Sequence, residues 1–164
     1  MRRTLVLIGL VASLTACASC SVGTQNERYR ISSPSMEPTI AEGSTVTAEV
    51  VKPGAYQPRT GDVVVFEVPD TWRPAEQEPP RIYRVVAVPG DTVSCCDDQD
   101  RIIRNGTPQD EPYIRTGDGL PPDFQAVTVP PGTVYLLGDN RGVANDSSQN
   151  GPLPTANVIG VVKL

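Results

Sequence analysis

The stretch RIYRVVAVPGD, from Arg81 to Asp91, is the part of the sequence that best indicates the fold. Its first eight residues are rich in Val and Ile, which is typical of a β-strand, and the Pro-Gly-Asp that follows is a turn signal. Seven other stretches of this kind are spaced along the chain. They are 44–51, 62–68, 92–95, 101–104, 124–129, 133–138 and 157–164. The pattern predicts a mainly β domain of antiparallel sheets built from short strands.

Length and composition agree with a single loop-rich β domain. The chain has 164 residues, of which 17 are proline and 14 are glycine. No long helical pattern, internal repeat or second domain is evident after residue 22, so residues 23–164 are expected to form one domain. Residues 1–22 are expected to be a separate apolar leader, with no other helix in the chain.

The charge and the missing histidines exclude several kinds of function. The formal net charge is −5 and no basic patch is visible, which disfavours nucleic-acid binding. The chain has no histidine, so it lacks the commonest general base and the commonest zinc ligand. The sequence therefore predicts no metal site and implies no cofactor.

Cys95 and Cys96 are adjacent in the sequence. Adjacent cysteines are neither a metal-binding spacing nor a disulfide framework. Across a trans peptide their Cα atoms would lie ~3.8 Å apart, below the ~4.4–6.8 Å of ordinary disulfides. We therefore expect two half-buried thiols at the end of a strand.

The leader permits two kinds of membrane tether. Arg2 and Arg3 precede an apolar run over residues 5–14, as in a signal peptide, and the LTAC that ends at Cys17 resembles a bacterial lipobox, which would place a lipid on Cys17. Alternatively, residues 5–22 are an uncleaved membrane helix with the arginines in the cytoplasm. Both alternatives stay open, and both place the folded domain on the outer face of a membrane.

The stretch ISSPSMEPTI, residues 31–40, contains a candidate nucleophile. A serine hydroxyl attacks only when a base removes its proton and a donor stabilises the oxyanion. Ser33 and Ser35 flank Pro34, and in an extended stretch residues two apart point the same way, so one serine would attack while the other donates. The alternative is that these are ordinary turn residues.

Four motifs follow the leader in a fixed order. They are SSPSMEPT at 32–39, RTGDVVVF at 59–66, RVVAVPGDTV at 84–93 and GDNRGVANDS at 138–147. The series resembles the type I signal peptidases, membrane-tethered serine endopeptidases that remove signal peptides. The nucleophile motif Ser-x-Ser-Met-x-Pro-Thr matches at 33–39, and the Arg-Val motif matches with Ala87 in place of glycine.

The resemblance implies a role for each matching residue. Ser35 would be the nucleophile, and Ser33 would donate to the oxyanion beside the backbone N–H of Ser35. Pro34 and Met36 would contact the substrate. The polar scaffold of the site would comprise Asp139, Asn140, Arg141 and Asp146. The family's fold is mostly β, and its substrates are exported preproteins with small residues before the scissile bond.

The sequence departs from the family where the general base is expected. The family's bacterial members place a lysine immediately before the arginine of the Arg-Val motif, and here that residue is Tyr83. The serine that supports the lysine is replaced by Ala144, and a later arginine by Ser148. Tyr83 would serve as the base only if Arg81 or Arg84 favoured its phenolate; the alternative is an aromatic strand residue without a catalytic role.

The sequence thus predicts a signal-peptidase-like serine endopeptidase on the outer face of a bacterial membrane, acting on exported preproteins. The alternative from another class is an inactive relative that binds signal-peptide-like segments or a partner without cleaving them. A self-cleaving repressor is a third possibility. It is disfavoured because the chain has no room for a DNA-binding domain before Ser35 and its charge is negative.

Overall fold

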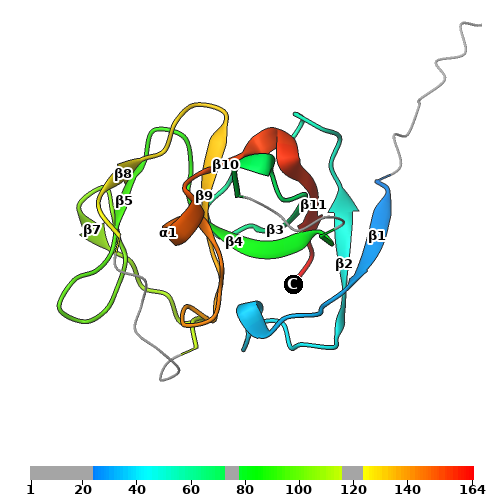
Figure 1. Cartoon of the computed structure of the whole chain (residues 1–164), viewed down its shortest axis with the longest axis horizontal. Coiled ribbons are helices and arrows are strands. Elements are labelled where there is room, and N and C mark those ends of the chain that lie inside the picture. The colour runs from blue at the N-terminus through cyan, green and yellow to red at the C-terminus, as the bar shows by residue number, and fades with distance from the viewer. Residues whose placement is uncertain (1–23, 73–77, 116–123) are drawn as a thin grey trace, which may run out of the picture.

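The computed structural model describes residues 24–72, 78–115 and 124–164, which form two antiparallel sheets (Figure 1). The larger sheet has the strand order β1-β2-β11-β3-β4-β9-β10, and the smaller has the order β7-β6-β5-β8. The larger sheet contains β1 (Asn26–Arg30), β2 (Thr45–Val50), β3 (Val63–Phe66), β4 (Arg81–Ala87), β9 (Thr133–Leu137), β10 (Leu153–Pro154) and β11 (Val158–Val162). The smaller contains β5 (Thr92–Ser94), β6 (Ile103–Arg104), β7 (Thr107–Pro108) and β8 (Val127–Thr128). The predicted mainly β class is confirmed.

Strands β3 and β4 form the centre of the larger sheet. Every residue of β3 is buried, and so is every residue of β4 after Arg81. Burying a side chain the size of Val or Phe stabilises the fold by about 1.5–3 kcal/mol. A strand that is buried on both faces therefore has apolar residues at most positions of its sequence. This explains why the sequence around these two strands is the clearest strand signal in the chain.

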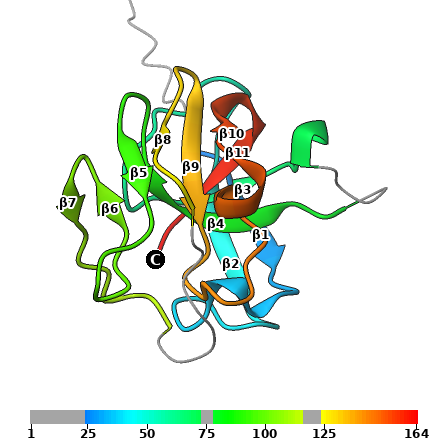
Figure 2. The same ribbon diagram turned by 60° about the vertical axis from the view of Figure 1, so that its left-hand side comes forward.

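Strand β4 also connects the two hydrophobic cores. Val85 packs in the larger core, whereas Val86 and Ala87 pack in the smaller one, beside β5. The pairing of β4 with β9 shifts register between Val85 and Ala87, which is a β-bulge. Figure 2 shows the smaller sheet beside the larger one, on the side where β4 and β9 of the larger sheet lie.

The hairpin that joins β6 to β7 follows a known sequence rule. Its two loop residues are Asn105 and Gly106, which have φ angles of 52° and 77°. Asn-Gly is the preferred pair for a two-residue turn with positive φ at both positions, because its twist matches that of the flanking strands. The Asn105 amide also donates to Asp91, which ties the hairpin to the turn before β5.

Several elements differ from the sequence-based expectations. Strand β1 lies in a stretch whose polarity gave no strand signal; it is an exposed edge strand and buries little. The prediction of no helix after the leader is wrong, because a single α-helical turn, α1 (Ser147–Asn150), is capped by the Asp146 side chain. Three short 3₁₀ turns also occur in the described residues. They are η1 (Pro34–Met36), η2 (Asp70–Trp72) and η3 (Thr155–Asn157).

The expectation of two free thiols is also wrong. Cys95 and Cys96 form a disulfide across a cis peptide bond, with their Cα atoms 3.0 Å apart. The sequence argument assumed a trans peptide, in which the Cα atoms are farther apart. The pair lies just after β5.

Both tether hypotheses, including the lipid on Cys17, concern residues outside the described ranges. Within the described part of the chain, no helix is long and apolar enough to cross a membrane. The first described element is β1, which begins at Asn26.

Candidate active site

The serine loop forms a 3₁₀ turn instead of the expected extended stretch. Ser33 is the N-cap of η1, and its hydroxyl accepts a hydrogen bond of 3.3 Å from the backbone N–H of Ser35. Ser35 itself is buried, with 7% of its surface exposed, and Met36 beside it is also buried. The two donors expected to stabilise an oxyanion, the Ser33 hydroxyl and the Ser35 N–H, are therefore adjacent and bonded to each other.

The loop after β9 holds this turn in place through Asn140. The backbone N–H of Asn140 donates to the Ser35 carbonyl at 3.0 Å, and its side-chain amide donates to the Pro34 carbonyl at 3.2 Å. Two hydrogen bonds from one residue fix the position of the Ser35 backbone. Pro34 thus contacts Asn140 through its carbonyl and does not line the neighbouring pocket.

Gly138 allows the two loops to approach each other. A Cβ atom at Gly138 would lie 2.6 Å from the Ser35 carbonyl oxygen and 2.5 Å from the Ala144 Cβ atom. Both distances are far below a van der Waals contact, so only glycine permits this packing. The same Cβ would lie 3.5 Å from the Tyr83 ring, which shows that Ser35, Tyr83 and Ala144 surround one point.

Tyr83 lies on β4, and its ring points toward Gly138 and Ser35. The residue is 4% exposed, its ring packs against Phe66 with centroids 5.6 Å apart, and its hydroxyl interacts with the Ser35 hydroxyl. Burial raises the pKa of the Tyr83 phenol above its ordinary value; the charge of Arg81 and the contact with Ser35 lower it by less. The phenolate that a general base requires is thus disfavoured at neutral pH.

Arg84 does not support a Tyr83 phenolate, because it is paired elsewhere. Its guanidinium makes two hydrogen bonds of 2.8 and 2.7 Å to the Asp139 carboxylate and a third of 3.0 Å to the Gly61 carbonyl. The Thr39 hydroxyl donates to the same carboxylate. This buried pair connects β4 to the Gly138–Arg141 loop and to the segment that follows Ser35.

A second buried ion pair holds the other end of the loop. Arg141 donates to Glu111 at 2.7 and 3.1 Å and to the Gly138 carbonyl at 2.9 Å. The Tyr113 hydroxyl donates to Glu111, and the Tyr113 ring lies 3.9 Å from the Arg84 guanidinium. Glu111 and Tyr113 were not identified as scaffold residues from the sequence.

Asp146 completes the scaffold, and its charge acts on Tyr83. Its carboxylate accepts hydrogen bonds from the Gly138 N–H at 2.9 Å and from the N–H and hydroxyl of Ser148 at 3.0 and 2.7 Å. Burial raises the pKa of this carboxyl, while these hydrogen bonds lower it by less. Asp139, Asn140, Arg141 and Asp146 all lie in the polar network around Ser35. Among the described residues, no group of three or more His, Cys, Asp or Glu side chains is placed to hold a metal ion.

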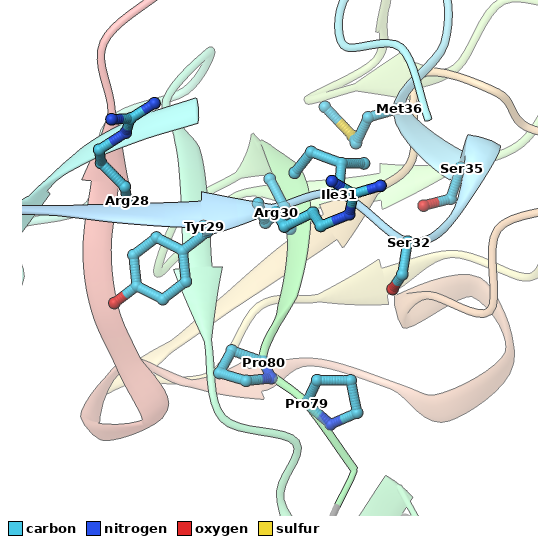
Figure 3. Close-up of a pocket in the computed structure, with 10 residues that line it drawn as sticks. Arg28, Tyr29, Arg30, Ile31, Ser32, Ser35, Met36, Pro79 and Pro80 are labelled. Carbon is cyan, nitrogen blue, oxygen red and sulfur yellow. The ribbon is translucent and has the colours of Figure 1, made fainter. Parts of the chain in front are cut away.

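A pocket of about 260 Å³ opens beside Ser35 (Figure 3). Its lining residues come from β1, from the serine loop and from the start of β4. They are Arg28, Tyr29, Arg30, Ile31, Ser32, Ser35, Met36, Pro79, Pro80 and Ile82. Ser35 and Met36 were predicted to contact a substrate or its scissile bond, whereas the contribution of β1 was not predicted because the strand itself was missed. A serine that lines a pocket beside polar groups is an arrangement that nucleophilic catalysis requires.

Comparison with known proteins agrees with this arrangement. The family model described as "Signal peptidase, peptidase S26" matches residues 2–164, and the chain belongs to this family. A probable signal peptidase I-1 from Synechocystis is 37% identical over 137 residues, which cover 81% of this chain and 66% of the relative. The signal peptidase I of Mycobacterium tuberculosis is 33% identical, over 83% of this chain and 63% of the relative. The chain thus spans just under two thirds of the length of these relatives.

A solved structure supports the same assignment. The crystal structure of a signal peptidase I from Enterococcus faecalis matches with a TM-score of 0.52 and 28% identity. The match covers 66% of this chain and 98% of that chain. The resemblance to signal peptidases that the four motifs indicated is therefore confirmed for the family and for the fold.

Proposed function

We propose that this protein is a membrane-tethered serine endopeptidase of the signal peptidase I type, which cleaves signal peptides from exported preproteins. The observation that carries the proposal is the position of Ser35 at one end of the pocket, held by Asn140. Family membership and the signal peptidase relatives support the same reaction class. Ser35 is the nucleophile, and Ser33 and the Ser35 N–H supply the oxyanion donors.

In the proposed mechanism, a substrate carbonyl enters beside Ser35 and displaces the hydrogen bond between the Ser33 hydroxyl and the Ser35 N–H. Both groups then donate to the oxyanion. The step with least support from this chain's residues is removal of the Ser35 proton, because Tyr83 is buried and its pKa is raised. Cleavage is consequently slow compared with that of a lysine-containing relative, by at least the ~10²–10⁴-fold that general-base catalysis supplies.

The test of this proposal is cleavage of a purified preprotein by the full chain in detergent, followed by mass spectrometry of the products. We expect slow cleavage after a small residue, and we expect Ser35→Ala to remove it. Ser147→Ala is a matched control, since this buried serine bonds to the Leu136 N–H and lies outside the pocket. Cleavage that persists in Ser35→Ala would exclude Ser35 as the nucleophile.

A second candidate function rests on Tyr83 and Ala144. Because both the base and its hydrogen-bonding partner are absent from their family positions, the domain is also suited to binding signal-peptide-like segments without cleaving them. The endopeptidase and the binding domain are distinguished by whether cleavage products form. An endopeptidase releases products in the assay above, whereas a binding domain retains the intact preprotein.

The tether is part of the proposal and rests on residues 1–22. A lipid on Cys17 and an uncleaved helix both keep Ser35 near the membrane, where preproteins emerge. The intact mass of the membrane-extracted protein distinguishes the two. A chain that begins at Cys17 with added acyl mass is expected for the lipoprotein, and a full-length chain excludes it.

A further inference from the structure

The pocket beside Ser35 is bounded on one side by the free edge of β1. Among the described residues, strand β1 pairs with β2 alone and is the first strand of the sheet. The Gln25 carbonyl accepts from Val50, and the Ile31 N–H donates to Ser44, so these residues bond toward β2. Because the direction of hydrogen bonding alternates along a strand, the main-chain groups of Arg28 and Arg30 point to the free edge.

The side chains of Arg28 and Arg30 make this edge positive. Both are exposed, both line the pocket, and the described residues of the pocket lining include no carboxylate. Their cross-strand neighbours in β2 are Thr47 and Thr45. Within the described residues, neither arginine forms an ion pair.

The carboxylates of β1 and β2 themselves are already engaged. Glu49, the one carboxylate on the same face of β2, pairs with Lys163 at 3.3 Å. Glu27 accepts the Tyr29 hydroxyl. Two unpaired cations in a concave site are unusual in a chain with a net charge of −5, and they are complementary to a negatively charged occupant.

We propose that Arg28 and Arg30 make this cleft select peptide segments that carry two acidic side chains at alternate positions near the scissile bond. The inference rests on the proposed function, because the peptide is the substrate of Ser35. A peptide added to the free edge of β1 would place every second side chain on the arginine face. Arg28 and Arg30 lie about 6.6 Å apart along the strand, which matches an acidic-x-acidic spacing.

An anionic membrane surface is the rival occupant. The arginines, however, share one concave site with Ser35 and with an unpaired strand edge, and in Figure 3 Arg30 lies between Arg28 and Ser35 along the pocket. A lipid headgroup would pair with the guanidinium groups but would leave the backbone edge unused. A peptide satisfies both, so the observations favour a peptide.

The experiment measures peptide binding to the full-length Ser35→Ala protein in detergent, so that the peptide stays intact. Two peptides with the same small residues carry either Glu-x-Glu or Gln-x-Gln, and the pair is moved stepwise along the sequence. We expect the Glu peptide to bind about three- to tenfold more tightly at one register, with the difference shrinking in ~0.5 M salt. Arg28→Glu with Arg30→Glu should reverse the preference, and the control Arg59→Glu, an exposed arginine outside the pocket, should keep it.

Each outcome decides the inference. If both peptides bind equally at every register, the inference about the arginines is wrong and the proposed function stands. If neither peptide binds at any register, the inference and the proposed function are both wrong. The same variants are mixed with vesicles that contain ~30% anionic lipid. If the double charge reversal weakens vesicle binding without changing peptide preference, the arginines serve the membrane and the inference is wrong.

Discussion

Replacing Tyr83 by Lys together with Ala144 by Ser is expected to raise the rate of preprotein cleavage by about 10²–10⁴-fold. The Tyr83 ring lies 3.5 Å from a Cβ placed on Gly138, and the Ala144 Cβ atom lies 2.5 Å from that same point, so the new side chains would meet beside Ser35. Lysine is smaller than tyrosine, and its amine would lie close to the Ser35 hydroxyl. The seryl hydroxyl at position 144 would orient the amine.

The site also provides the electrostatic conditions that a lysine base requires. Burial lowers the pKa of an amine because it disfavours the charged form. Tyr83 is 4% exposed, and the Arg81 charge acts on the same position and would lower the amine pKa further. The charge of Asp146 would oppose these effects but is shared among three hydrogen bonds.

Initial rates with a preprotein substrate measure this gain. The matched control is Tyr83→Met with Ala144→Ser, which has a side chain of similar length without an amine and should stay slow. Adding Ser35→Ala to the lysine variant should return it to background. A folded lysine variant with no gain would show that the cleft has changed beyond these two positions, and it would favour the binding-domain candidate.

Asp139→Ala is expected to destabilise the fold by about 3–5 kcal/mol, because it leaves the buried Arg84 guanidinium without its partner. The side chains of Arg84 and Asp139 are 8% and 0% exposed. The Thr39 hydroxyl would lose its acceptor as well. Since Asp139 precedes Asn140, the turn that holds Ser35 should loosen along with the loop.

Urea unfolding of the full chain measures this loss of stability. Lys163→Ala is the control, because the Lys163–Glu49 pair is 59% and 46% exposed and should contribute less than about 1 kcal/mol. If Asp139→Ala cost no more than Lys163→Ala, the buried pair would not be the support of the site that the structure indicates.

The β fold was predictable where strands bury β-branched residues on both faces, as β3 and β4 do. Strand β1 was not, because it is polar and exposed, and its place in the sheet depends on pairing with β2. The 3₁₀ turn at Ser35 was missed for a related reason. It is stabilised by Asn140, which is more than a hundred residues away in the sequence and adjacent only in the folded chain.

The candidate site residues were predictable by motif, but their electrostatics were not. The sequence left open whether neighbouring arginines lower the pKa of Tyr83. In the structure Arg84 is committed to Asp139, and burial outweighs the charge of Arg81. Whether the pKa of Tyr83 is raised or lowered depends on how deeply the residue is buried, and the spacing of residues in the sequence does not show this.

Whether the Tyr83 hydroxyl takes part in catalysis is measured by the rates at which wild-type protein and its Tyr83→Phe variant cleave one preprotein across a pH series. We predict slow cleavage that changes less than about twofold in Tyr83→Phe, since an ordinary tyrosine with a pKa near 10 is about 0.1% ionised at pH 7 and burial lowers this fraction further. Rapid wild-type cleavage that rises with pH above 10 and disappears in Tyr83→Phe would show that Tyr83 is the base.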